Sequence, residues 1–309
     1  MRSPIIMFGA LRSGTTLFRL MLDAHEDIAN PGESDFIFDY LIRGASSNHC
    51  VYDLDGLRQD RIFQSQNLKI LKSEDGREIA QDLVEQLEAR APDTYLCLAI
   101  HGNVDKALAI FSGCRIIHIV RDPRDVANSC IGMGWAGNTY FGVDQWLETE
   151  RNWEVSSSLL DKHQAIELHF EDLILQPRAQ LERVCKFVGV PFSPAMLSYS
   201  TKTTYAPPDP SAVEQWRTKL TPRDVALVEM KVGSLLSQRN YKMSGYPIDP
   251  IGSIEKMSLL WTNKIYKWRF ACRRYGLANF ALEKVTRLSK PLHAIMVRRI
   301  SEIDKLYLK

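Results

Sequence analysis

Residues 5–16 read Ile5-Ile6-Met7-Phe8-Gly9-Ala10-Leu11-Arg12-Ser13-Gly14-Thr15-Thr16, and this stretch decides the fold of the 309-residue chain. Its first four residues form a short apolar run, which is typical of a buried parallel strand. The next eight have the spacing G-x-x-x-x-G-T-T, and apolar residues then recur at helical spacing as far as His25. The order of strand, glycine-containing turn and helix predicts a phosphate-binding loop, because its N–H groups converge on an anion in front of the positive helix end.

Strand and helix patterns continue to alternate along the chain. We predict strands at 95–100, 115–120 and 165–170, helices at 76–90, 124–131, 144–162, 177–188 and 222–238, and loops at 30–33, 132–142 and 202–211. Such alternation favours an α/β fold, a P-loop NTPase-like parallel sheet flanked by helices, over residues 1–248. Residues 249–309 are predicted to form a basic helical C-terminal extension, with helical spacing at 258–274, 279–288 and 293–308.

The composition is that of an ordinary globular protein. Apolar residues make up 45% and charged residues 25% of the chain, which excludes disordered and fibrous classes. We see no apolar run near the roughly 18 residues of a membrane span and no signal peptide, and six scattered cysteines fit reduced core positions. From these features we expect a cytoplasmic protein.

The phosphate loop lacks the lysine of a nucleotide kinase, because Thr15 stands in its place. A kinase needs that lysine to hold the β- and γ-phosphates beside Mg²⁺. A donor with one phosphate before its transferable group can instead use hydroxyls, backbone amides and an arginine, and Arg12 lies inside the loop. A P-loop small-molecule kinase and a nucleotide-binding protein without catalysis remain alternatives.

A second motif follows the predicted strand at 115–120. It reads Arg121-Asp122-Pro123-Arg124-Asp125-Val126-Ala127-Asn128-Ser129, with an arginine at the strand end and a serine about two helical turns later. This arginine and this hydroxyl could grip a second phosphate of the same nucleotide.

The two motifs together resemble the PAPS-dependent sulfotransferases, which use 3′-phosphoadenosine 5′-phosphosulfate (PAPS), and especially their tyrosylprotein sulfotransferase-like branch. Residues 12–25 resemble the 5′-phosphosulfate loop, residues 121–129 the 3′-phosphate motif, and residues 168–173 (Leu-His-Phe-Glu-Asp-Leu) a further family segment. The resemblance implies PAPS as co-substrate, no metal, and transfer of a sulfuryl group to an acceptor hydroxyl. It also implies a set of donor-binding residues: Arg12, Ser13, Gly14, Thr15, Thr16, Arg121, Ser129, Phe170 and Ser200. Because the family's arginine after the motif serine is Met133 here and a family lysine is Gln215, we expect Arg217 or Lys219 to supply the missing charge.

The same resemblance suggests the catalytic groups. A glutamate downstream of the loop is the general base in that branch, and Glu33 stands at the matching position, where it could take the acceptor's proton. Arg12 would stabilise charge on the bridging oxygen. The family's lysine near the next strand end is absent, so His101 or Lys106 is expected to replace it. Peptide tyrosine, a glycan, a lipid and a small molecule all remain open as acceptors, and neither a nucleic-acid partner nor an oligomeric state is indicated.

Charge is distributed unevenly along the chain. Residues 256–309 carry 13 Lys or Arg against three acids, a balance of +10 within a net charge of +2, so the preceding residues carry −8. Aromatic residues such as Trp261 and Trp268 are interleaved with these cations. This tail is interpreted as a peripheral contact with a membrane or other anionic surface, a lid over an acidic glycan or peptide, or a helical cover whose aromatic residues are core.

Overall fold

The computed structural model describes residues 3–43, 50–201 and 203–286, together with residues 296, 299, 300 and 303. Its strands are β1 (Ile5–Phe8), β2 (Ile28–Ala29), β3 (Leu41–Arg43), β4 (Cys50–Tyr52), β5 (Tyr95–Ile100), β6 (Arg115–Val120) and β7 (Ala165–His169). Its first eight helices are α1 (Thr15–Asp23), α2 (Phe36–Asp39), α3 (Leu54–Gln59), α4 (Arg61–Gln66), α5 (Gly76–Glu88), α6 (Val104–Ile110), α7 (Pro123–Gly132) and α8 (Thr139–Gly142). The remaining helices are α9 (Asp144–Ser157), α10 (Phe170–Leu175), α11 (Pro177–Val188), α12 (Trp216–Lys219), α13 (Pro222–Val232), α14 (Leu235–Gln238), α15 (Ser253–Tyr275) and α16 (Leu277–Thr286), with 3₁₀ turns η1 (Pro194–Thr201) and η2 (Pro210–Ala212).

Five parallel strands form the central sheet, in the order β2-β5-β1-β6-β7. Strand β1 lies in the middle, and its Ile6 is opposite Leu98 of β5 and Ile116 of β6. Because all five strands run in one direction, the loops that follow β1, β5 and β6 meet at a single edge of the sheet. This confirms the predicted parallel sheet.

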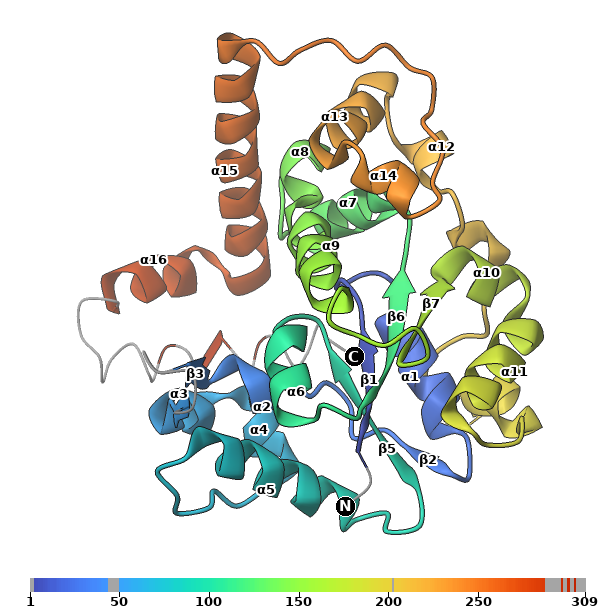
Figure 1. Ribbon diagram of the computed structural model, residues 1–309. Helices are drawn as coiled ribbons and strands as arrows, with labels where there is room; N and C mark the ends of the chain where they lie inside the picture. The colour runs from blue at the N-terminus through green and yellow to red at the C-terminus, as the bar shows by residue number, and fades with distance from the viewer. Residues whose placement is uncertain are drawn as a thin grey trace.

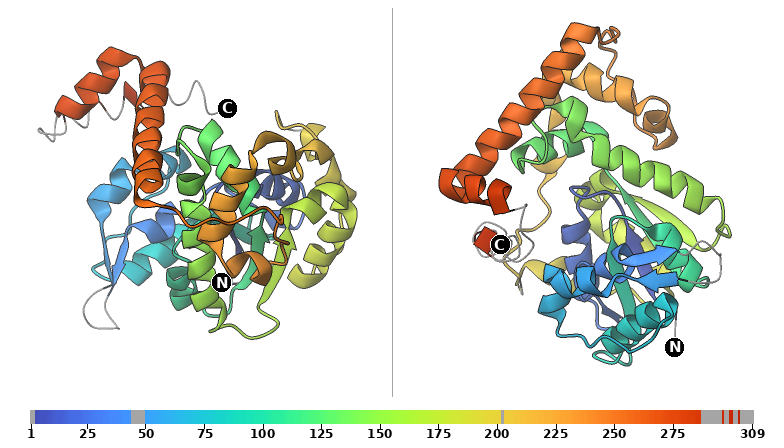
Figure 2. Two further views of the ribbon diagram at one scale, coloured as in Figure 1. Left: turned by 90° about the horizontal axis from the view of Figure 1, so that it is seen from above. Right: turned by 90° about the vertical axis from the view of Figure 1, so that its left-hand side faces the viewer.

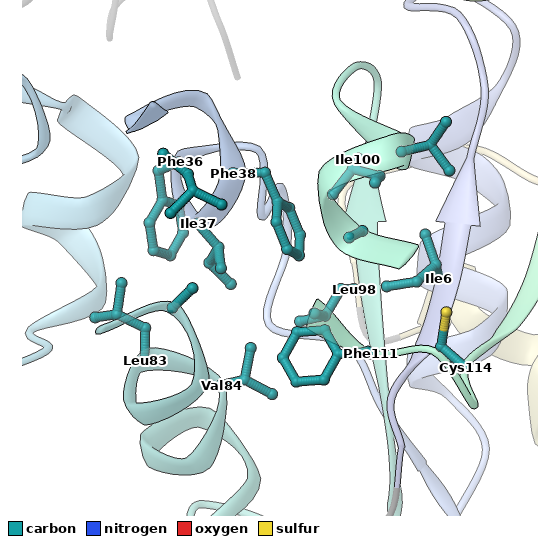
Figure 3. Packing of buried hydrophobic residues seen from close by; sticks show 14 of the residues in the cluster. Ile6, Phe36, Ile37, Phe38, Leu83, Val84, Leu98, Ile100, Phe111 and Cys114 are labelled. Carbon is teal, nitrogen blue, oxygen red and sulfur yellow. The ribbon is translucent and has the colours of Figure 1, made fainter. Parts of the chain in front are cut away.

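Helices cover both faces of this sheet, as Figures 1 and 2 show. Alternate residues of a strand point to opposite faces, so Ile6 and Phe8 pack with α2, α5 and α6, whereas Ile5 and Met7 pack with α1, α11 and η1. Figure 3 shows the first of these cores, in which Phe36, Ile37 and Phe38 of α2 face Leu83 and Val84 of α5 and the strand residues Leu98 and Ile100. Burial of both faces explains why the strands are apolar runs without polar alternation.

A third core lies beyond the ends of β1 and β6. It joins α7, α9, α13 and α14 through Val126, Trp146, Val228 and Leu236. The core fixes α7, which carries the second sequence motif, against the rest of the domain.

Several element boundaries differ from the prediction. The predicted helix at 222–238 is two helices, because Gly233 has a φ of 61° and ends α13. The predicted loop at 132–142 contains α8, which starts where the side chain of Asn138 accepts the N–H of Phe141. Strand β2 and the β3–β4 hairpin were not predicted.

The basic C-terminal segment begins with two helices, α15 and α16, and Figure 1 shows α15 along the side of the domain next to α8. No residue of α15 is buried, and Trp261 and Trp268 are 58% and 51% exposed. The interpretation of these aromatic residues as core is therefore wrong. Most of the predicted helix at 293–308 lies outside the described residues, and the domain boundary at 248/249 stays a prediction.

Candidate nucleotide and catalytic site

The loop between β1 and α1 has the backbone conformation of an anion cradle. Arg12 and Gly14 both have left-handed backbones, with φ angles of 72° and 84°. A Cβ on Gly14 would lie 2.2 Å from the Phe170 ring, so no side chain fits there. No side chain caps the N-terminus of α1, which leaves its first-turn N–H groups and its positive dipole end to a ligand.

The two sequence motifs meet at Arg12. Its Nε donates to Oγ of Ser129 at 2.9 Å, although 117 residues separate them. Arg121 completes the link, because its Nη1 donates to the carbonyl oxygen of Arg12 at 3.0 Å and its guanidinium lies 4.4 Å from the centre of the Phe170 ring. The structure thus brings together four of the predicted donor-binding residues.

Two hydrogen-bond donors of the two motifs are buried and have no acceptor among the described residues. They are Oγ of Ser13, which is fully buried, and Nε of Arg121. Burying an unpaired donor is costly, so such atoms are expected where a ligand completes the structure. One of these donors lies in each motif, which fits a nucleotide that carries two separate phosphates.

A buried ion network holds the second motif in place. The side chain of Asp122 caps α7 and binds Arg124, whose Nη1 reaches Glu229 of α13 at 2.7 Å. The guanidinium of Arg124 also lies 3.8 Å from the centre of the Trp216 ring. These contacts fix the start of α7 and with it the direction of Arg121.

Asp125 adds a negative charge behind Arg121. Its Oδ2 lies 3.7 Å from Nη2 of Arg121, and its Oδ1 accepts the backbone N–H of Trp216 at 2.7 Å. Burial raises the pKa of Asp125 to about 6, although Arg121 opposes this shift. Burial also lowers the pKa of Arg121.

His101 lies directly beside the phosphate loop. Its Nε2 is 3.2 Å from Oγ1 of Thr15, while Asp35 binds both its Nδ1 at 2.8 Å and its backbone N–H at 2.6 Å. The alternative residue, Lys106, donates to the carbonyl oxygen of Phe38 at the end of α2. The geometry therefore favours His101 over Lys106 at the loop.

Asp35 is a residue that sequence reasoning missed. The sequence offered one indication, because Asp35 lies two residues after Glu33, in the segment predicted to carry the general base. Its pairing with His101, 66 residues away, could not be inferred from spacing.

Glu33 lies beside the end of β5. It forms an isolated parallel bridge with Ala99, and the next N–H, that of Ser34, donates to the carbonyl oxygen of Ala99 at 2.8 Å. The Glu33 side chain is half-buried and has no hydrogen-bond or ion-pair partner within the described ranges. Its backbone is thus fixed and its carboxylate remains available.

The other predicted donor-binding residues are Thr16, Ser200 and Arg217. Thr16 lies on the first turn of α1, and Ser200 lies in η1, which packs on α1 through Tyr199. Arg217 is exposed and bound by Glu214 through two hydrogen bonds of 2.7 and 2.8 Å, an interaction that raises its pKa. Its charge is thus already paired, and no hydrogen bond or ion pair joins it to Arg12 or Arg121 within the described residues, so its role at the donor stays a prediction.

A metal site is not formed by the described part of the chain, in which no three His, Cys, Asp or Glu residues cluster suitably. Nor does any helix within these residues have the length and apolar character needed to cross a bilayer.

Comparisons with known proteins bear on the same residues. A family model described as "Sulfotransferase family" matches residues 4–194. A protein-tyrosine sulfotransferase of Drosophila melanogaster is 25% identical over 213 residues, covering 63% of this chain and 40% of the relative. Protein-tyrosine sulfotransferase A of Caenorhabditis elegans is 24% identical over 208 residues (64% and 53%), and protein-tyrosine sulfotransferase 1 of Danio rerio is 24% identical over 279 residues (79% and 74%). The chain thus spans about half the length of the first two relatives.

Solved structures share the fold. The sulfotransferase domain from the curacin biosynthetic pathway has a TM-score of 0.55 at 19% identity, covering 79% of this chain and 99% of that domain. The sulfotransferase domain from the Synechococcus PCC 7002 olefin synthase has a TM-score of 0.52 at 21% identity, covering 74% and 94%. At these identities the likeness concerns the fold alone.

The relatives correct one prediction. Protein-tyrosine sulfotransferases are Golgi membrane enzymes, so the expectation of a cytoplasmic location is wrong. That expectation relied on the absence of a recognisable leader or span, and such an absence does not define a compartment.

Proposed function

Because this chain belongs to the sulfotransferase family, as its sequence motifs predicted, we propose that it transfers a sulfuryl group from PAPS to an acceptor hydroxyl. The observation that carries the proposal is the hydrogen bond between Arg12 and Ser129, which joins the phosphate loop to the second motif. A kinase loop needs a lysine at position 15, where this chain has threonine, so no observation favours phosphoryl transfer.

Two groups of residues would hold the donor. The N–H groups at the start of α1, with Ser13, Thr15 and Thr16, would bind the 5′-phosphosulfate, which supplies the group to be transferred. Arg121 and Ser129 would bind the 3′-phosphate, and Phe170 offers the adenosine a ring beside Gly14. The unpartnered Ser13 Oγ and Arg121 Nε support this assignment.

Glu33 is proposed as the general base. An acceptor O–H must lose its proton as its oxygen attacks sulfur. The backbone of Glu33 is fixed at the end of β5, and its carboxylate has no partner among the described residues. Arg12 and His101 would stabilise charge on the bridging oxygen. Arg12 lies in the phosphate loop and contacts Ser129 of the second motif, and His101 contacts Thr15 of the loop.

The acceptor class is tested first with a tyrosine peptide, because the relatives are named protein-tyrosine sulfotransferases. Labelled-sulfate assays with glycan, lipid and phenolic acceptors follow. In these assays Glu33→Gln is expected to lower kcat roughly 10²- to 10⁴-fold, the usual contribution of a general base. The exposed Glu74→Gln is the control, and full activity of Glu33→Gln would remove Glu33 from the role of base.

Nucleotide binding is tested separately by thermal unfolding. Adenosine 3′,5′-bisphosphate at a hundred times its Kd should stabilise the fold by about 2.7 kcal/mol, whereas ATP–Mg²⁺ should have a much smaller effect. Stabilisation by ATP–Mg²⁺ alone would overturn the proposal in favour of a kinase. Stabilisation by the bisphosphate without transfer to any acceptor would indicate a nucleotide-binding protein without catalysis.

A further inference from the structure

Helix α15 exposes a continuous apolar stripe. Ile254, Met257, Trp261, Ile265 and Trp268 follow one another at intervals of three or four residues, so they share one side of the helix. Each is at least half exposed, from 50% for Ile265 to 89% for Ile254. A stripe of this kind normally packs on a core, yet here it faces away from the domain.

The other side of α15 is fixed to the domain. Asn263 Oδ1 accepts the N–H of Gly137 at 2.7 Å, and Tyr266 donates to the carbonyl oxygen of Ile131 at 3.1 Å. Gly134 and Gly137 permit this approach, since an added Cβ would lie 2.2 Å from the Phe270 ring at Gly134 and 2.7 Å from Asn263 Cα at Gly137. The helix is therefore docked with its apolar stripe directed outward.

Helix α16 also exposes apolar side chains and contacts the stripe at one point. The rings of Trp268 and Phe280 meet edge to face with centroids 6.4 Å apart. Leu277, Leu282 and Val285 of α16 are 68%, 47% and 66% exposed. Exposed apolar side chains thus occur on both helices, more of them than the isolated ones that are normal on proteins.

Positive charge borders the stripe. Helix α15 contains six Lys or Arg residues and one acid, Glu255, which Arg223 of α13 already pairs at 2.6 Å. At about 100° per residue, Lys264 and Lys267 flank the stripe on one side and Arg269 on the other. The ammonium of Lys264 lies 5.5 Å from the centre of the Trp261 ring.

We propose that this stripe is a docking surface for an anionic phospholipid bilayer, lying in the plane of the headgroups. Tryptophan and lysine suit this position, because the ring sits at the interface while the ammonium reaches the headgroup phosphates. A second copy of the helix fits less well, since pairing two stripes would bring their flanking cations together. The inference does not depend on sulfuryl transfer.

Vesicle co-sedimentation of the full chain tests the proposal. Binding is expected to phosphatidylcholine vesicles that contain phosphatidylserine, to weaken with salt, and to be weak with phosphatidylcholine alone. Neutralising two flanking cations in Lys264→Gln/Lys267→Gln should weaken binding roughly 30-fold. Trp261→Ser/Trp268→Ser should also release the protein from the vesicles.

The matched control is Val155→Ser/Leu159→Ser, which removes two side chains, in α9 and just after it, that are 70% and 78% exposed. Unchanged circular dichroism and unchanged stabilisation by adenosine 3′,5′-bisphosphate show that the variants fold. Vesicle binding that survives both α15 variants, or that is equal for neutral and anionic vesicles, overturns the proposal. A dimer that dissociates in the tryptophan variant, without vesicle binding, would assign the stripe to a second copy. Binding of a soluble anionic glycan that needs the lysines but not the tryptophans would likewise exclude the bilayer.

Discussion

At the scale of single residues, Asp35 determines how His101 meets the phosphate loop. Its two carboxylate oxygens hold the backbone N–H and Nδ1 of His101, which directs Nε2 toward Thr15. A carboxylate in this position accepts a hydrogen bond from the Nδ1–H and so fixes the orientation of the ring. Asp35 is thus a positioning residue for a group at the site.

The variant Asp35→Asn tests this role. We expect kcat to fall roughly tenfold to a hundredfold, the value of one or two hydrogen bonds to a charged group, while the Kd for adenosine 3′,5′-bisphosphate stays the same. Steady-state kinetics and calorimetric titration measure the two quantities, and the exposed Asp93→Asn is the control. A Kd that rises in proportion to the loss of kcat would show that Asp35 merely supports the fold of the loop.

At the scale of elements, the junction between the loop and α1 tolerates only glycine at position 14. The φ of 84° strains any other residue, and the Phe170 ring occupies the space of a Cβ at 2.2 Å. Gly14→Ala should therefore displace either the loop or Phe170 and weaken binding of adenosine 3′,5′-bisphosphate at least about tenfold, with a stability loss of about 1–3 kcal/mol. Gly32→Ala is the matched control, since Gly32 also has a positive φ, 98°, but nothing lies within 4 Å of an added Cβ. Equal nucleotide affinity in both variants would contradict the close packing of Phe170 on the loop.

The sequence allowed some elements to be predicted and not others, for identifiable reasons. The strands Tyr95–Ile100 and Arg115–Val120 were predicted with their observed bounds, because a strand buried on both faces is a continuous apolar run. Strand β2 has only two residues, too few to show a hydrophobic periodicity, so this strand, which pairs with β5, was not predicted. Ser129 was predicted at the site from the family motif, whereas its bond to Arg12 depends on how α7 crosses the loop, which no local pattern encodes.

At the scale of the whole molecule, a buried ion network links separate layers. His118 of β6 is fully buried and bonds Glu150 of α9 at 3.2 Å, with Glu167 of β7 3.4 Å from its other ring nitrogen. Arg239, just after α14, donates to Glu150. The network therefore couples the central sheet to the third core, which supports the second motif.

Protonation of this network predicts how stability depends on pH. Burial lowers the pKa of His118, but Glu150 and Glu167 outweigh it and raise that pKa above its ordinary value of 6.5. Burial also acts to raise the pKa of Glu167, but hydrogen bonds from His118 and His169 outweigh it and lower that pKa below 4.5. A raised histidine pKa contributes stability that is complete below 6.5 and is lost as pH rises through the raised value. The Glu167 contribution is complete above 4.5 and is lost as pH falls, so the network stabilises the fold most between these two values.

Replacing His118 should remove the loss of stability that occurs as pH rises through the raised pKa of this histidine. His118→Gln is expected to cost about 3 kcal/mol near pH 5.5, where it removes the buried cation between Glu150 and Glu167 and leaves Arg239 to pair with Glu150. The cost should shrink as pH rises beyond the raised pKa, where the wild-type ring has itself become neutral. Urea unfolding at a series of pH values measures the difference, and the exposed His163→Gln should follow the wild type throughout. A constant loss of stability at every pH would mean that His118 acts through its packing on Trp153, whose ring centre is 4.4 Å away, and not through its charge.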